Sequence, residues 1–165
     1  VRTLIEEGIA ETAKREYPEA EALFGTATAG IAHAAIAAQF LGLPMGYVRG
    51  SAKDHGRQNQ VEGKLSKGDK VVVVEDLIST GGSVLDCVKV LQENGAEVLG
   101  IVSIFTYGMQ KGKDRLAEAK VINHSLCDLD ALLPVAVEQG YIEKEEQEKL
   151  LRFRDNPSDE SWREA

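Results

Sequence analysis

Four consecutive valines, at positions 71–74, are the sequence feature that most limits how this chain can fold. A run of β-branched residues without alternating polar residues is typical of a strand buried on both faces, as in parallel sheets covered by helices. Two carboxylates, Glu75 and Asp76, follow the run, and Gly81 and Gly82 then open a helical pattern. The sequence therefore predicts a central parallel strand that ends in an acidic, glycine-containing loop before a helix.

Strand and helix patterns alternate along almost the whole chain. Hydrophobic periodicity and turn residues predict helices over residues 2–17, 31–41, 81–94, 114–119, 128–139 and 143–153, and strands over residues 21–24, 45–49, 61–65, 70–75, 96–106 and 120–125. Pro18 should end the first helix, and Asp128 should cap the start of the fifth. This alternation predicts an α/β fold with a mainly parallel central sheet flanked by helices. We expect one domain over residues 1–154 and a polar, disordered tail over residues 155–165.

The composition argues against several classes of protein. No apolar run approaches the roughly 18 residues that span a bilayer, so we expect no membrane segment. The net charge of −8 argues against a nucleic-acid-binding protein, because affinity for a phosphate backbone comes from Lys and Arg. Cys87 and Cys127 lack the number and spacing of a disulfide framework or a metal site, so we expect two buried thiols in a reducing cytoplasm.

The loop after the valine strand carries the clearest chemical signal. Glycines and small residues allow backbone N–H groups to approach a phosphate, and the start of a helix favours its negative charge. The preceding carboxylates would repel a phosphate but would accept hydrogen bonds from ribose hydroxyls. Neither the Gly-Lys-Ser/Thr pattern of a P-loop nor the Gly-x-Gly-x-x-Gly pattern of a dinucleotide site is present, so a sugar phosphate is the better match. On residue types alone, a structural alternative stays open, in which Asp76 and Ser79 cap the helix and the glycines form a turn.

A second loop, over residues 50–60, is polar, contains glycine and lacks periodicity. Two arginines, a lysine and a histidine fall within residues 49–57, where Asp54 is the only opposing charge. Such a local concentration of positive charge in an acidic protein suits a phosphorylated small molecule. On its own, a charged run of this kind is also typical of a solvated loop.

Residues 71–83 closely resemble the motif with which type I phosphoribosyltransferases bind 5-phosphoribosyl-1-pyrophosphate (PRPP): four apolar residues, Glu-Asp, two apolar residues and Ser-Thr-Gly-Gly-Ser. The implied fold is the Rossmann-like fold of that family. The resemblance implies that Glu75 and Asp76 bind the ribose hydroxyls. It also implies a cradle for the 5′-phosphate formed by Ser79, Thr80, Gly81, Gly82 and Ser83.

The segment Lys53-Asp54-His55-Gly56 resembles the catalytic loop of orotate phosphoribosyltransferases, and it lies between two predicted strands as that family requires. The resemblance implies that the catalytic residues are Lys53, His55 and Arg49. It implies in addition that Ser79 and Tyr107 contact orotate.

Residues 23–30, Leu-Phe-Gly-Thr-Ala-Thr-Ala-Gly, resemble the pyrophosphate-binding turn of the same family. The resemblance implies that backbone amides take the leaving group in a turn formed by Thr26, Ala27, Thr28, Ala29 and Gly30. The family often has a strained peptide bond in this turn, and here we expect it near Ala27 and Thr28, where a cis bond would be rare for residues other than proline.

The resemblance further implies a Mg²⁺-dependent transfer of the phosphoribosyl group from PRPP to orotate, which gives orotidine 5′-monophosphate and pyrophosphate in pyrimidine biosynthesis. Mg²⁺ would be held mainly by PRPP rather than by metal ligands of the protein. The implied state is a cytoplasmic homodimer with shared active sites. The opening residues resemble the middle of a structured domain, so we expect a segment that contributes to orotate binding to precede Val1.

Two alternative functions stay open. The first is another base, such as adenine or xanthine, against which the segment Lys53-Asp54-His55-Gly56 argues. The chain also departs from some family members at Thr28, Ala29, Gly50 and Tyr107. The second is a PRPP-sensing regulator that binds DNA and catalyses nothing. The retained catalytic loop and the acidic net charge argue against the regulator.

Overall fold

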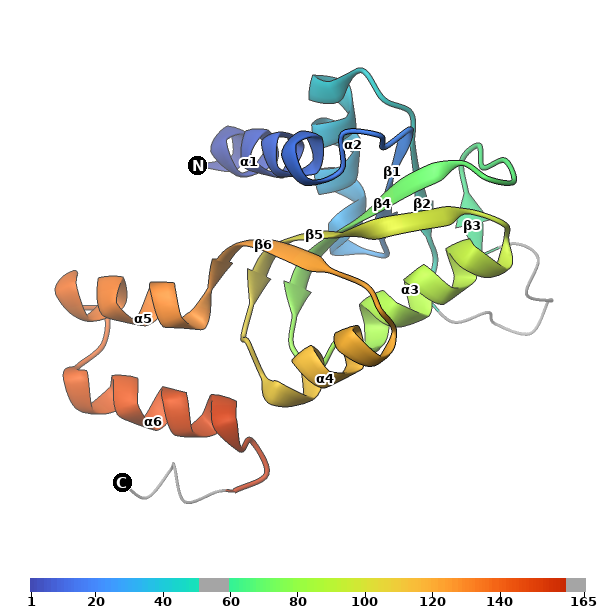
Figure 1. Ribbon diagram of the computed structural model, residues 1–165. Helices are drawn as coiled ribbons and strands as arrows, with labels where there is room; N and C mark the ends of the chain where they lie inside the picture. Colours follow the sequence, from blue (N-terminus) through green and yellow to red (C-terminus); the bar gives the residue numbers. More distant parts are fainter. Residues whose placement is uncertain (51–59, 160–165) are drawn as a thin grey trace.

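The structure, a computed structural model, describes residues 1–50 and 60–159. Within these residues, six strands form a sheet in the order β3-β2-β1-β4-β5-β6 (Figure 1). β2 and β3 pair antiparallel, and the other neighbouring strands pair parallel. The strands are β1 (Ala22–Thr26), β2 (Met45–Val48), β3 (Val61–Glu62), β4 (Lys70–Ile78), β5 (Glu97–Thr106) and β6 (Asn123–Asp128).

Helices cover both faces of this sheet. They are α1 (Arg2–Glu16), α2 (Ala29–Leu41), α3 (Gly82–Glu93), α4 (Gln110–Glu118), α5 (Leu129–Glu138) and α6 (Lys144–Asp155). α1 and α2 lie on one face and α3 and α4 on the other, while α5 and α6 lie together beyond the carboxyl end of β6 (Figure 1). The predicted α/β fold with a mainly parallel sheet is confirmed. None of the described helices has the length and apolar character needed to cross a membrane.

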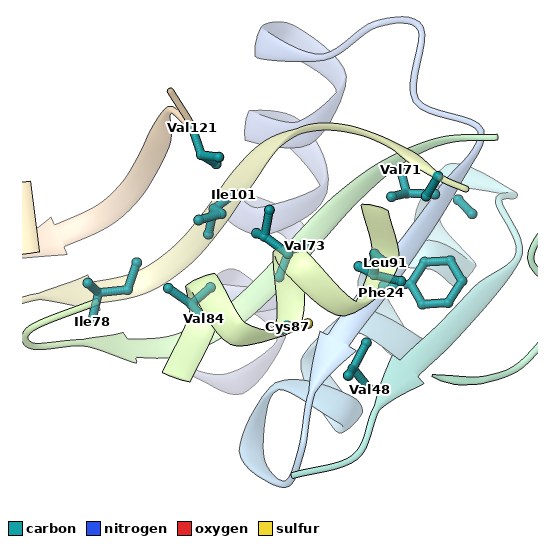
Figure 2. Close-up of a cluster of buried hydrophobic side chains, with 13 residues drawn as sticks. Phe24, Val48, Val71, Val73, Ile78, Val84, Cys87, Leu91, Ile101 and Val121 are labelled. Carbon is teal, nitrogen blue, oxygen red and sulfur yellow. The ribbon is translucent and has the colours of Figure 1, made fainter. Parts of the chain in front are cut away.

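The valine run forms the middle of β4 and is buried on both faces, as its composition predicts. The first and third valines pack toward α3, with Phe24 of β1 and Leu91 of α3 (Figure 2). The second and fourth pack toward α1 and α2. All four have no exposed surface. Because β4 has parallel neighbours on both sides, its carboxyl end lies beside those of β1 and β5 at one edge of the sheet.

Some predicted boundaries are wrong. β4 continues past residue 75 to Ile78, because Ile78 still pairs with Thr106 of β5. β6 begins at Asn123 rather than at 120, where Lys120 adopts a left-handed backbone with φ 56° in the turn after α4. α4 begins at Gln110, four residues before its predicted start at 114, and β3 covers two residues instead of five.

The predicted helix caps agree with the structure. Asp128 precedes α5, and its Oδ1 accepts a 2.8 Å hydrogen bond from the backbone N–H of Ala131. Such a cap satisfies one of the N–H groups that a helix start leaves without a partner. α1 ends at Glu16, just before Pro18, which cannot continue a helix.

Leu91 offers a direct test of how far the α3 side of the core stabilises the fold. Leu91 has no exposed surface, whereas Leu132 on α5 is 45% exposed. We expect Leu91→Ala to lower the free energy of unfolding by about 2–5 kcal/mol, because it removes buried methyl groups and leaves a cavity. Leu132→Ala, the same chemical change at a partly exposed site, should cost less than half as much. Urea denaturation followed by circular dichroism measures both, and equal losses would contradict this account of the core.

Candidate functional site

The carboxyl ends of β1 and β4 bring a hydroxyl and a carboxylate together. Thr26 ends β1, and Glu75 lies toward the end of the neighbouring strand β4. The Thr26 hydroxyl donates a 2.6 Å hydrogen bond to Glu75 Oε1, and the backbone N–H of Asp76 donates to the same atom at 3.1 Å. Thr26 and Glu75 are only 4% and 5% exposed. Glu75 and Asp76 are called the acidic pair below. Through Glu75, this pair is joined directly to the turn that follows β1.

The surroundings of Glu75 oppose its negative charge. Burial raises the pKa of Glu75 to about 7, and the neighbouring Asp76 carboxyl contributes to the rise. The hydrogen bond from Thr26 acts in the opposite direction, because it favours the ionised carboxylate. Burial also raises the pKa of the nearby Cys87 thiol to about 12, so this cysteine is not a thiolate nucleophile at neutral pH. A carboxyl group with a strongly raised pKa at a strand end is typical of a functional site.

The turn after β1 has the geometry expected from the sequence. Among the described residues it holds the one cis peptide bond, between Ala27 and Thr28. α2 begins directly afterwards, at Ala29. Gly30 packs so closely against β4 that a Cβ atom at this position would lie 2.5 Å from the carbonyl oxygen of Val74. The turn thus sets the start of a helix beside the acidic pair, and a helix start is suited to an anion.

The predicted phosphate loop joins β4 to α3. Gly81 is buried and has a left-handed backbone with φ 74°, a conformation that favours glycine. α3 begins at Gly82. Ser79 and Thr80 are partly buried, and Ser83 is exposed on the first turn of α3. α2 begins after the turn that follows β1, and α3 begins after this loop. The starts of these two helices therefore lie on the two sides of the acidic pair.

A cavity of about 390 Å³ opens between β1, β2 and α3. It is lined by Thr26 and Ala27 of the turn, by Arg49 after β2 and by Ser83 of α3, among others. Arg49 Nη2 lies 2.8 Å from Glu62 Oε1, in an ion pair whose side chains are both about half exposed. The structure thus brings Arg49, predicted as catalytic, to the same cavity as the predicted pyrophosphate turn.

Ser79 and Tyr107, the predicted contacts to the base, lie at neighbouring strand ends. The backbone N–H of Tyr107 donates to Ile78 O at 3.0 Å. The Tyr107 ring packs edge-on against Phe105, with ring centroids 5.4 Å apart. Ser79 also lines a second cavity, of about 300 Å³, that reaches Asn123 of β6. No local pattern marks the β6 side of this cavity, because Ser79 and Asn123 lie on different elements far apart in the sequence.

Two predicted catalytic residues, Lys53 and His55, lie outside the residues that the structure describes. In the described part of the chain, no three His, Cys, Asp or Glu side chains gather in a way that could hold a metal ion. The structure adds Arg115 of α4, whose guanidinium donates to Thr80 O at 3.1 Å. No local pattern marks Arg115, because this contact joins residues 35 positions apart.

Comparison with known proteins identifies the family of this chain. The profile of the family described as phosphoribosyl transferase domain matches residues 2–131. The fold and the site thus define a phosphoribosyltransferase. The orotate phosphoribosyltransferases of Bacillus cytotoxicus and Bacillus anthracis are each 56% identical to this chain over 162 residues, which is 98% of the chain and 77% of each relative. The chain belongs to the orotate phosphoribosyltransferase family.

Solved structures give the same result for the fold. The orotate phosphoribosyltransferase of Aeropyrum pernix superposes with a TM-score of 0.73 at 31% identity, over 86% of this chain and 77% of that one. The UMP synthase of Leishmania donovani gives a TM-score of 0.79 over 91% of this chain and 32% of that one. At 24% identity, this second likeness concerns the fold alone.

The raised pKa of Glu75 predicts a pH-dependent stability. Between its ordinary value of 4.5 and about 7, the folded protein holds a proton at this position that the unfolded chain releases. Stability from this group should therefore fall as the pH rises through that window and stay low above it. Glu75→Gln keeps the shape and removes the charge, so its Tm should exceed that of the wild type by a margin that grows from pH 5 to pH 8. Thermal melts at constant ionic strength measure this margin.

Glu7→Gln is the matched control for this measurement, because Glu7 is exposed on α1. Its Tm should follow the wild type across the same pH range. Parallel curves for Glu75→Gln and the wild type would contradict the assignment of a buried, proton-holding carboxyl at position 75.

Proposed function

We propose that this chain transfers the phosphoribosyl group of PRPP to orotate and releases pyrophosphate. The observation that carries the proposal is the 2.6 Å hydrogen bond between Thr26 and Glu75. It joins a turn suited to pyrophosphate to a carboxylate suited to ribose hydroxyls. With the phosphate loop on the other side of the acidic pair, the order of groups along the sheet edge matches a ribose that carries phosphates at both ends.

Each part of the site has a separate role in binding PRPP. Glu75 and Asp76 accept hydrogen bonds from the ribose hydroxyls. The 5′-phosphate is held by the loop at the start of α3, formed by Ser79, Thr80, Gly81, Gly82 and Ser83. The leaving pyrophosphate is held by the turn at the start of α2, formed by Thr26, Ala27, Thr28, Ala29 and Gly30. The left-handed Gly81 just before α3 and the close approach of Gly30 to β4 support these roles, because they fix the backbone at the starts of the two helices.

Catalysis in such a site is mainly electrostatic. When a base nitrogen displaces pyrophosphate from C1 of the ribose, the sugar gains positive charge and the pyrophosphate gains negative charge. Cations that face the leaving group therefore stabilise the transition state more than the ground state. We propose Lys53, Arg49 and His55 for this role, and the position of Arg49 at the same cavity as Ala27 supports its part in it.

The similar curated relatives support orotate as the base. The curated relatives at 56% identity are orotate phosphoribosyltransferases, and residues 53–56 carry the loop sequence of that family. We propose that Ser79 and Tyr107 contact the base, because Ser79 directly follows β4 and Tyr107 directly follows β5, at neighbouring strand ends. Adenine and xanthine are the competing bases that a substrate comparison separates.

Mg²⁺ is the proposed metal. Carboxylate oxygens are ligands that this ion prefers, and Glu75 and Asp76 supply them at the ribose site. We propose that the ion would be held mainly by the phosphates of PRPP and by water, as the family resemblance implies. When bound, it would neutralise part of the charge that gathers on the pyrophosphate.

The proposed oligomeric state and cellular location are those that the family resemblance implies. We propose a homodimer with shared active sites, a cytoplasmic location and a single catalytic domain over residues 1–154. Cys87 and Cys127 are both free thiols, which supports a reducing compartment. The expected tail over residues 155–165 lies partly outside the described residues, since α6 ends at Asp155 and the description ends at residue 159.

Pyrophosphate release with PRPP and Mg²⁺ tests the proposed reaction. We expect release with orotate and less than about a hundredth of that rate with adenine or xanthine, because a site that hydrogen-bonds one base leaves buried polar groups unpaired with another. Omission of the base should abolish release. Equal rates with orotate and adenine would reject orotate as the specific substrate, and binding of PRPP without release under any condition would favour the regulator.

Lys53 should act on the transition state. We expect Lys53→Ala to lower kcat by about 100-fold or more while the Kd for PRPP changes by less than about threefold, because the leaving group gains its extra charge only during the reaction. Lys64→Ala, which removes the same charge from an exposed position after β3, should leave both values unchanged. An equal loss in kcat and in PRPP affinity would assign Lys53 to ground-state binding instead.

A further inference from the structure

Helix α4 approaches the phosphate loop more closely than ordinary packing allows. A Cβ atom at Gly112 would lie 2.6 Å from the carbonyl oxygen of Ser79, so only glycine permits this contact. Gly112 is buried, and its backbone also lies beside Gly81. The first half of α4 therefore forms a support behind the loop at the very residues that precede α3 (Figure 1).

Arg115, one turn further along α4, holds the same loop by hydrogen bonds. Its Nη1 donates to Thr80 O at 3.1 Å and lies 3.4 Å from Thr80 Oγ1. The same nitrogen would lie 3.3 Å from a Cβ atom at Gly82, so the guanidinium extends along the start of α3. Within the described residues, none of the salt bridges involves Arg115. Its positive charge is directed at the loop.

The contact with Thr80 has a geometric consequence for the next N–H group. The peptide bond between Thr80 and Gly81 is trans, so its carbonyl and its N–H point in opposite directions. When Arg115 binds the carbonyl oxygen from the α4 side, the N–H of Gly81 is turned away from α4. The guanidinium also adds positive potential to a helix start that already favours an anion.

We propose that Arg115 is a positioning residue that presets the loop over residues 79–83 for the 5′-phosphate of PRPP. This inference rests on the proposed function, and it adds to that function a side chain from outside the motif. Arg115 acts through Thr80 rather than on the reacting atoms, so it should affect affinity for the phosphate end of the ligand and leave the pyrophosphate end unchanged.

Isothermal titration with Mg²⁺ and three probes separates the two ends: PRPP, ribose 5-phosphate and inorganic pyrophosphate. Arg115→Met keeps an unbranched side chain of similar length and removes the charge and the donors. We expect it to weaken binding of PRPP and ribose 5-phosphate by about tenfold or more, as loss of a charged hydrogen bond would. Pyrophosphate binding should stay within about twofold of the wild type.

Two further variants show whether the charge and the hydrogen-bond donor of Arg115 cause the loss of affinity. Arg115→Lys keeps a charge and a donor of similar reach, so we expect it to recover most of the affinity for ribose 5-phosphate. Lys111→Met removes one positive charge from an exposed position on the same helix and should match the wild type with all three probes. A thermal melt of each variant shows whether the fold is retained.

The binding results distinguish a failure of the positioning role from a failure of the proposed function. If the wild type binds PRPP but Arg115→Met behaves like Lys111→Met, the positioning role is overturned and the proposed function stands. If Arg115→Met loses both ends of the ligand equally and melts at lower temperature, Arg115 is a general structural residue and the inference fails. If the wild type binds none of the three probes, the proposed function fails and the inference fails with it.

Discussion

The burial of β4 on both faces is the constraint on which the rest of the structure depends. A strand that exposes no side chain in its middle must have helices above and below it and strands on both sides. Its charged residues then lie outside this middle, with Lys70 at the start of β4 and Glu75 and Asp76 toward its carboxyl end. Parallel pairing brings the ends of β1 and β5 to the same edge, so the packing of the core determines where the loops of the site meet.

The same burial makes Glu75 a compromise between folding and function. The Glu75 carboxyl lies in surroundings that raise its pKa, and the Thr26 hydroxyl offsets only part of this effect. Above about pH 7, the protein therefore carries a charge at Glu75 that it would be more stable without. Active sites commonly retain such groups, because binding and catalysis depend on interactions that are left incomplete in the free protein.

The sequence predicted the parts of the fold and the site that depend on local residue types. The valine strand, the glycine that opens α3, the cap at Asp128 and the cis bond near Ala27 all follow from short patterns or from the family resemblance. The sequence could not predict contacts between distant segments. Thr26 meets Glu75 across 49 positions, and Arg115 meets Thr80 across 35. The end of β4 was missed for the same reason, since its last residues are strand only because β5 pairs with them.

Gly30 and Gly112 limit how this site can be redesigned. Each stands on a helix that contacts a backbone carbonyl at the site or next to it, that of Val74 beside Glu75 in one case and that of Ser79 in the other, at a separation that leaves no room for a methyl group. A mutant library aimed at a new base should therefore leave these two positions invariant and vary the side chains around them. Diversity introduced at either glycine would displace a helix and, with it, the strand end or loop that it contacts.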